Sequence, residues 1–502
     1  MQDASPLHEE VSSAEYARVV PEVCNMIQEW MRAGEHAEAL VTPYSNASDS
    51  RAEWHLELNE EGVDDKELLR SMQTILQHSV NPWTDRFLAK LYTAPTVTSM
   101  CGDMLLSAMN ASVHVFSASP ALSLVEEECV RKLCDLYGFG TRADGVSMPG
   151  GAASNTLAVQ TALSCAFHGV YRSEGIAGQI RVLMQEYNRV GTGARPTILT
   201  GVDSHFSIDR AALASGLGRN AVVHVESDAH GRMRVDALEQ LLKEMTSDPA
   251  HPLGMPFFVN ATSGTTVLGA FDNLRAIAKL CKEYRCWLHV DASWGGPAIF
   301  SEKLRKELFD GAELANSLTM NPHKLLNVTH QCSFLLVKDG RCLSEHAIRA
   351  GYLFHETQSE SEHRVTDRAT MTLGCGRRGE ALKLFLTWRK YGTKQLGNHL
   401  DHGVKVAQQL LADLRTNPHM EVGPVADPLF LQICFRPRRM PGNLTGSDAT
   451  HAVCARLQRD RRYAVDFAPS SNGDYLRLVV HPRTPSSIYF ALIKQITAYA
   501  TD

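Results

Sequence analysis

The chain has 502 residues, 44% hydrophobic and 21% charged, which is long enough for about two or three domains with separate cores. The net charge of −6 gives no general attraction to nucleic acid or to an anionic membrane. No run of about 18 apolar residues is present, and the first residues, Met1 to Glu10, do not resemble a secretory signal. The twelve cysteines contain no Cys-x-x-Cys pair, so we expect a reduced, cytosolic protein with no metal site.

Residues 1–80 are predicted to form an N-terminal helical segment. Residues 12–36 carry apolar side chains, such as Val19 and Val23, at helical spacing, and a second helix is expected over Asp65–His78. The stretch between the two helices is polar and irregular. We therefore expect this segment to pack on the rest of the chain rather than to fold alone.

Residues 81–375 show the alternation of strands and helices that is typical of an α/β domain with a mostly parallel, doubly wound sheet. The expected strands lie at residues 197–199, 221–225, 257–259, 287–290 and 333–337. The expected helices lie at residues 98–109, 124–137, 154–170, 235–245, 274–284 and 302–308.

Residues 376–502 are predicted to form a smaller α+β domain. Helices are expected at residues 380–390, 403–415 and 486–500, and strands at residues 430–435 and 475–480. A basic cluster, Arg436-Pro437-Arg438-Arg439, lies in a stretch rich in proline and glycine. We interpret this cluster as an exposed loop rather than a phosphate-binding patch.

Two segments are suited to hold a flat, phosphorylated cofactor. Met148–Asn155 places Gly150 and Gly151 before a predicted helix, where free N–H groups can hold a phosphate, although an ordinary glycine-rich turn is an alternative. The strand Trp287–Val290 leads into Asp291, at the sheet edge where parallel sheets bind ligands. A turn or helix-capping aspartate is the alternative there. In a pyridoxal phosphate site this acid would pair with the protonated pyridine nitrogen.

Three further segments could complete such a site. His205 offers a ring that could stack on a flat cofactor, although a lone histidine is more often structural. The polar loop Asn260–Thr266 follows a predicted strand at the same sheet edge. Lys324, in Asn321-Pro322-His323-Lys324, is a candidate Schiff-base nucleophile. An amine condenses with an aldehyde only when neutral, so burial or a nearby cation must lower its pKa.

Taken in this order, the segments resemble the group II pyridoxal-phosphate-dependent amino acid decarboxylases of the fold-type I (aspartate aminotransferase-like) superfamily. The closer likeness is to the glutamate, cysteine sulfinate and aspartate decarboxylase-like branch, from about residue 80 to the C-terminus. The matching segments are Pro149–Gly151, Ser204–Ser207, Ser263–Asp272, Val290–Gly296, Asn321–Lys324, Gln331–Ser333, Ala350–Phe354 and Cys375–Arg377. The resemblance implies a fold-type I large domain, pyridoxal 5′-phosphate as the cofactor, and a homodimer.

The resemblance also implies roles for individual residues. Lys324 would hold the cofactor as an internal aldimine, Asp291 would bind the pyridine nitrogen and His205 would stack on the ring. Arg477 would bind the substrate α-carboxylate, a task that suits the planar guanidinium fork. The residues expected around the phosphate are Gly151, Ala152, Ser317, Asn321 and His323, and Thr262 would face the 3′-oxygen side of the ring.

Two places depart from the family pattern. The segment Phe87–Leu91 has Ala89 and Lys90 where relatives have Asn and Gln, and that Gln lies near the substrate side chain. We hypothesise that Lys90 offers a cation to the distal acidic group of a short substrate such as aspartate. The segment His355–Thr372, which matches the family's mobile loop, lacks the tyrosine that usually protonates the carbanion after CO2 loss. His363 is the nearest donor by type, although a solvated loop histidine is its more ordinary interpretation.

The expected function is α-decarboxylation of aspartate, glutamate or cysteine sulfinate to the amine and CO2. The expected protein is a cytosolic homodimer that binds no nucleic acid, membrane or metal. Because the loop tyrosine is missing, a diverted reaction such as aldehyde formation is an alternative. A non-catalytic family member is a third possibility, against which the presence of Lys324, Asp291, His205 and Arg477 argues.

Overall fold

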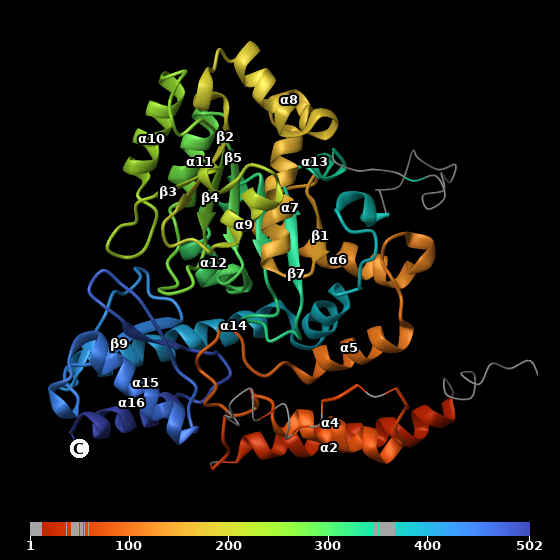
Figure 1. Ribbon diagram of the computed structural model, residues 1–502, viewed down its shortest axis with the longest axis vertical. Coiled ribbons are helices and arrows are strands. Elements are labelled where there is room, and N and C mark those ends of the chain that lie inside the picture. Colours follow the sequence, from red (N-terminus) through yellow and green to blue (C-terminus); the bar gives the residue numbers. More distant parts are fainter. Residues whose placement is uncertain are drawn as a thin grey trace, which may run out of the picture.

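The computed structural model describes residues 13–36, 38–41, 50, 54, 56–58, 60–345, 350 and 367–501. Its largest element is a seven-stranded sheet with the order β1-β7-β6-β5-β4-β2-β3 (Figure 1). The strands are β1 (Asp144–Met148), β2 (Pro196–Gly201), β3 (Val222–Val225), β4 (Met255–Thr262), β5 (Trp287–Ala292), β6 (Ser317–Met320) and β7 (Ser333–Val337). All pairs from β6 to β3 are parallel, whereas β7 is antiparallel to both of its neighbours. This confirms the predicted α/β domain with a mostly parallel sheet.

Helices cover both faces of this sheet, because successive residues of a strand point to opposite sides. Ile198 and Phe258 belong to the core on one face, and their neighbours Leu199 and Val259 belong to the core on the other. The first face is covered by α7 (Gly151–Cys165), α8 (Tyr171–Gln185) and α9 (Ser207–Ala214). The second is covered by α6 (Pro120–Tyr137), α10 (Val235–Ser247) and α11 (Leu274–Glu283). Polar side chains within these layers are therefore deeply buried.

The two ends of the chain form the remaining parts. The helices α2 (Ser13–Glu35) and α4 (Asp65–Gln77) lie side by side along one end of the molecule (Figure 1). The C-terminal part has an antiparallel sheet with the order β10-β11-β9-β8, which confirms the predicted small α+β fold. Its elements are β8 (Met420–Val422), β9 (Gln432–Pro437), α15 (Gly446–Asp460), β10 (Asp466–Ala468), β11 (Tyr475–Val479) and α16 (Ser486–Thr501). The domain boundaries at residues 80 and 375 stay a prediction.

The structure differs from the predicted elements in a few places. The two helices expected at residues 380–390 and 403–415 are parts of α14 (Ala381–Thr416), which is broken only at Gly392, where φ is 66°. The strands β1, β6, β8 and β10 and the helices α8, α9 and α15 were not predicted. Within the described part of the chain, no helix has both the length and the apolar character needed to cross a membrane.

The interpretation of the basic cluster as an exposed loop was wrong for its first two residues, Arg436 and Pro437, which lie buried in β9. Arg436 lies in β9 and is 8% exposed. Its guanidinium pairs with Glu421 at 2.9 Å and lies over the ring of Tyr475. The fold brings a carboxylate and an aromatic ring to the Arg436 guanidinium. This side chain is therefore buried, although the local composition predicts that it is exposed.

Candidate active site

A cavity of about 320 Å³ lies where β4, β5 and β6 end, beside the start of α7. The carboxyl ends of parallel strands are the usual ligand site of such sheets. Of the residues predicted to contact the cofactor, those that line the cavity are Gly151, Ala152, His205, Thr262, Asp291, Asn321, His323 and Lys324. Further lining residues to which the sequence analysis gave no role are Ser207, Gly264, Thr266, Ser293, Trp294, His330 and Gln331. Most of these lie in the recognised motifs, but His330 lies in none.

The start of α7 forms a cradle for an anion. Gly150 has φ 104°, which favours glycine, and no described side chain caps the helix. A Cβ at Gly151 would lie 2.6 Å from Ser293 Oγ and 2.7 Å from Asn321 Nδ2, so only glycine leaves this space open. Among the described residues, Asn321 Oδ1 is buried without a hydrogen-bond partner. Free N–H groups at a helix start fit the phosphate of the cofactor.

Lys324 lies after β6 and lines the cavity. Burial lowers the pKa of its ammonium group, and the charge of Asp291 opposes that shift. The Nδ1 of the preceding His323 lies 2.5 Å from the backbone oxygen of Cys332 and 3.1 Å from its backbone nitrogen. Burial, with the nearby His330 and lysine charges, lowers the pKa of His323 to about 3. The lowered pKa values of Lys324 and His323 favour neutral nitrogen atoms beside the cradle, and a neutral amine is the form that reacts with an aldehyde.

Asp291 and His205 form the opposite part of the lining. Asp291 is 4% exposed, and its carboxylate accepts hydrogen bonds from the Ser293 backbone at 3.0 Å and from Asn155 Nδ2 at 2.9 Å. Burial opposes its ionisation, but the hydrogen bonds from Ser293 hold its pKa below the ordinary value. Burial also lowers the pKa of His205. The site therefore pairs a buried carboxylate with a neutral ring, which fits a protonated pyridine nitrogen and a stacked cofactor ring.

Neither of the two predicted substrate residues lines the cavity. Arg477, on β11, donates to the carbonyl of Thr266 at 3.3 Å and to the carbonyl of Ala89 at 2.6 Å. Thr266 lines the cavity, so the guanidinium lies directly behind that wall. Lys90 pairs with Asp466 at 2.9 Å, and its side chain is 51% exposed. Asp466 faces Arg477 in the β10–β11 ladder, which brings both cations around one carboxylate.

Ser317 was expected near the phosphate, but the structure places it elsewhere. It is the first residue of β6, whereas Asn321, which lines the cavity, directly follows the last residue of that strand. The Ser317 hydroxyl lies 2.8 Å from His289 Nδ1 and accepts from Trp287 Nε1 at 2.8 Å. It therefore belongs to the polar interior behind Asp291.

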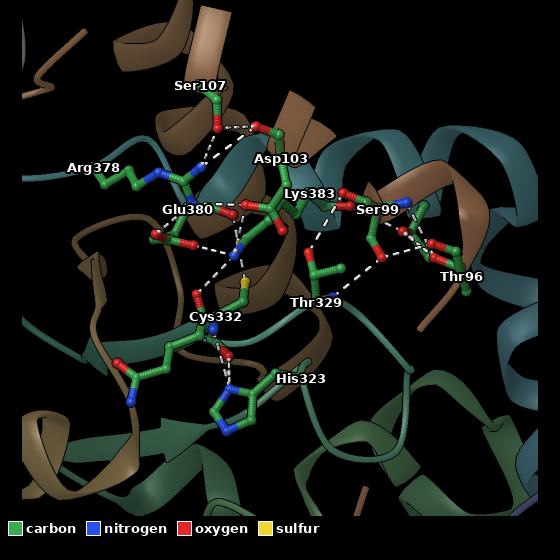
Figure 2. Close-up of polar contacts among 12 residues, drawn as sticks. Thr96, Ser99, Asp103, Ser107, His323, Thr329, Cys332, Arg378, Glu380 and Lys383 are labelled. Carbon is green, nitrogen blue, oxygen red and sulfur yellow. Dashed lines mark hydrogen bonds and ion pairs between the residues drawn. The ribbon is translucent and has the colours of Figure 1, made fainter. Parts of the chain in front are cut away.

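Thr329 and Cys332, on either side of His330 and Gln331, contact Ser99 of helix α5 (Val97–Met109) and Glu380 at the start of α14 (Figure 2). The fully buried Lys383 donates to the Gln331 carbonyl at 3.0 Å and forms an ion pair with Glu380. Thr329 N donates to Ser99 Oγ at 3.1 Å. One wall of the cavity is thereby tied to two helices.

Part of the predicted mobile loop, including His363, lies outside the described residues, as does most of the motif Ala350–Phe354. The described end of that loop begins at Asp367, whose carboxylate accepts from the backbone N–H of Phe116 at 2.8 Å. The role of His363 therefore stays a prediction.

The fold and the cavity define a fold-type I pyridoxal phosphate enzyme, and comparison with known proteins narrows the class. Residues 48–438 match the pyridoxal-dependent decarboxylase conserved domain. The L-aspartate decarboxylase of Metarhizium robertsii is 36% identical over 466 residues, which cover 91% of this chain and 88% of that protein. Human cysteine sulfinic acid decarboxylase is 30% identical over 474 residues, which cover 91% of this chain and 90% of that protein.

A solved structure agrees with these sequence relatives. The crystal structure of mouse CSAD in apo form matches with a TM-score of 0.85 and 26% identity, over 97% of this chain and 99% of that one. The chain belongs to the pyridoxal-dependent decarboxylase family. It is a carboxy-lyase that uses pyridoxal 5′-phosphate.

Proposed function

We propose that this enzyme removes the α-carboxylate of a small acidic L-amino acid as CO2, with aspartate preferred over glutamate and cysteine sulfinate. The observation that carries this proposal is that Arg477 lies behind the Thr266 wall and that Lys90 pairs with Asp466, which faces Arg477 across the β10–β11 ladder. An acidic substrate brings two anionic groups, the α-carboxylate and a distal carboxylate or sulfinate, and two neighbouring cations suit it. The similarity to the aspartate decarboxylase of Metarhizium robertsii supports the choice of substrate.

Five residues have a task in this proposal, four that line the cavity and Arg477 behind its wall. Bound pyridoxal phosphate supplies an electron sink for the electron pair that remains when CO2 leaves. Lys324 offers a neutral amine to the cofactor aldehyde, and Asp291 holds a proton at the pyridine nitrogen. The start of α7 at Gly151 binds the phosphate, and His205 offers the flat face of its ring. Arg477 binds the substrate α-carboxylate.

Product analysis tests the proposal. The purified holoenzyme is incubated separately with aspartate, glutamate, cysteine sulfinate and a panel of aromatic and basic amino acids, and CO2, amine, aldehyde and ammonia are measured. We expect CO2 and the matching amine in equal amounts from an acidic substrate, with the highest kcat/KM for aspartate. A preference for aromatic or basic amino acids would contradict the proposal.

A diverted reaction is the second candidate, because no tyrosine occurs in residues 355–372. In that case the same experiment would give CO2 together with aldehyde, ammonia or peroxide. A non-catalytic protein would bind the cofactor and give no product from any substrate. The three outcomes differ in their products and are therefore distinguished by one assay.

Lys90 provides a sharper test of substrate choice. Its replacement in Lys90→Gln removes the cation that we assign to the distal acidic group, and a charge-assisted contact contributes roughly 1.5–3 kcal/mol. We therefore expect kcat/KM for aspartate to fall by about tenfold or more relative to glutamate. Lys66→Gln, at an exposed position on α4, is the control. An unchanged ranking of substrates in Lys90→Gln would contradict the assignment.

The family resemblance also leads us to propose a homodimer located in the cytosol, built from segments 1–80, 81–375 and 376–502. Light scattering of the purified protein measures its oligomeric state, cell fractionation measures its location, and limited proteolysis maps the boundaries of the segments. A monomer, a membrane-bound fraction or cleavage away from these boundaries would contradict the respective point.

A further inference from the structure

A row of polar side chains lies behind Asp291, in the layer between the sheet and α7. Trp287, His289 and Asp291 occupy alternate positions of β5 and so face the same side of the sheet. Ser317 is paired with His289 in the β5–β6 register, and Asn155 approaches from the first turns of α7. His289 and Ser317 are fully buried, and Asn155 is 1% exposed. Polar groups buried this deeply are costly unless each finds a partner.

Each neighbouring pair in this row is within hydrogen-bond distance. Trp287 Nε1 lies 2.8 Å from Ser317 Oγ, which lies 2.8 Å from His289 Nδ1. His289 Nε2 lies 3.1 Å from Asn155 Oδ1, and Asn155 Nδ2 lies 2.9 Å from Asp291 Oδ2. The chain therefore runs without a break from the indole to the carboxylate.

The direction of every bond follows from the chemistry of the two ends. An amide that donates to a carboxylate presents its oxygen to the other neighbour, so Asn155 Oδ1 accepts and His289 Nε2 carries the hydrogen. Burial lowers the pKa of His289 to about 4, so the ring is neutral and Nδ1 accepts from the Ser317 hydroxyl. The indole of Trp287 can only donate, and it donates to Ser317. All four bonds thus donate toward Asp291.

We propose that Asn155, His289 and Ser317 are positioning residues that orient the Asp291 carboxylate and keep it charged opposite the pyridine nitrogen of the cofactor. Donors aligned toward an anion polarise one another and favour its charged form. The other titratable groups facing Asp291 are His205, before α9, and Lys324, after β6. The inference depends on the family cofactor but not on the proposed substrate.

Ser317→Ala tests the chain at its far end, without touching the cavity. The reconstituted variant is compared with the wild type in the dissociation constant for pyridoxal phosphate and in the pH dependence of the bound cofactor's absorption. We expect binding to weaken by about tenfold and the pH midpoint to shift. Thr319→Val is the matched control, because Thr319 is equally buried on β6. Its hydroxyl lies 3.4 Å from the donor nitrogen of His289 and is not one of the groups that form the row.

A second pair of variants separates positioning from packing. His289→Gln keeps an N–H donor for Asn155, whereas His289→Leu does not, so the proposal predicts better cofactor binding and a smaller pH shift for the glutamine variant. Thermal unfolding of each apoprotein shows which variants retain the fold. The proposal would be overturned if Ser317→Ala and Thr319→Val had the same cofactor affinity and pH midpoint, or if the two His289 variants did. Since the readout is cofactor binding, these outcomes do not depend on which amino acid the enzyme decarboxylates.

Discussion

Lys324 must lose a proton before it can react, and its surroundings control that loss. Burial lowers its pKa while Asp291 opposes the shift, so the neutral amine becomes abundant at a pH below the ordinary lysine value of 10.5. Above the pKa the amine is free, and below it the ammonium cannot condense with an aldehyde. We therefore predict that the rate of cofactor uptake by the apoprotein rises with pH, with a midpoint below 10.5. Absorbance after rapid mixing measures that rate.

The assignment of Lys324 as the residue that reacts with the cofactor has a separate chemical control. Borohydride reduction of the holoenzyme should fix the cofactor on the peptide that contains Lys324, as peptide mass spectrometry can show. Lys324→Arg should remain unlabelled and should lose activity by about a thousandfold or more, because its guanidinium stays protonated. A label on another lysine, or uptake that is independent of pH, would contradict the assignment.

The sequence predicted the lining residues well where each one ends a strand or starts a helix. Asp291 lies at the end of the predicted strand β5, so its place at the carboxyl edge of the sheet could be inferred from chain order, whereas Lys324 follows a strand that was not predicted and was singled out by the motif Asn321–Lys324. Ser317 could not be placed in this way, because the unpredicted strand β6 carries it away from the cavity. The pairing of Lys90 with Asp466 joins residues 376 positions apart, and no local pattern contains such a contact.

Gly151 shows how the start of a helix can be tested as a binding element. A Cβ at this position would lie 2.6 Å from Ser293 Oγ and 2.7 Å from Asn321 Nδ2, inside the space assigned to the phosphate. Gly151→Ala should therefore weaken cofactor binding by about tenfold to a hundredfold, since overpacking costs about 1–3 kcal/mol. Equilibrium titration of the apoprotein with the cofactor provides the measurement. Gly62→Ala, where a Cβ meets nothing within 4 Å, should bind normally, and weak binding in both variants would argue against the cradle.

Helix α14 supports the cavity wall through a buried cation. Lys383 is fully buried between Glu380 and the carbonyl of Gln331, so Lys383→Met would leave the Glu380 carboxylate without that partner (Figure 2). Breaking a buried pair in this way typically costs about 3–5 kcal/mol, and we expect a loss of that size in the free energy of unfolding. Urea unfolding measures it, and Lys405→Met, exposed on the same helix, is the control. Equal stability of the two variants would contradict the supporting role.

At the level of elements, periodicity located many of the helices but not α8 or α9, and it missed features that depend on partners. It predicted two helices where α14 is a single helix with a break only at Gly392, whose positive φ residue spacing does not indicate. Arg436, on β9, is buried because Glu421 and Tyr475 contact it from the neighbouring strands β8 and β11 of the same sheet. Short strands such as β6, with four residues, carry too few positions for an apolar pattern to be recognised.

Over the whole molecule, buried histidines couple stability to pH. Burial lowers the pKa of His289 and His481 to about 4 and that of His323 to about 3, whereas an unfolded histidine has its ordinary value of 6.5. Between pH 6.5 and about 4 the unfolded chain therefore binds more protons than the folded chain, and stability falls as pH falls. Each such histidine contributes up to about 1.4 kcal/mol per pH unit. We predict a steep loss of apoprotein stability that begins just below pH 6.5 and is measured by urea midpoints.

His481 allows this coupling to be tested away from the active site. His481→Gln removes one of the buried histidines whose pKa is lowered, so we expect the dependence of stability on pH to become shallower over the same range. His419→Gln, at an exposed position, should leave that dependence unchanged. Burial raises the pKa of the Glu126 carboxyl, but the charge of Arg377 outweighs that effect and lowers the pKa below its ordinary value of 4.5. The contribution of Glu126 to stability is therefore lost only as pH falls below 4.5. A loss of stability confined to that more acidic range would therefore assign the effect to buried carboxylates and contradict the histidine mechanism.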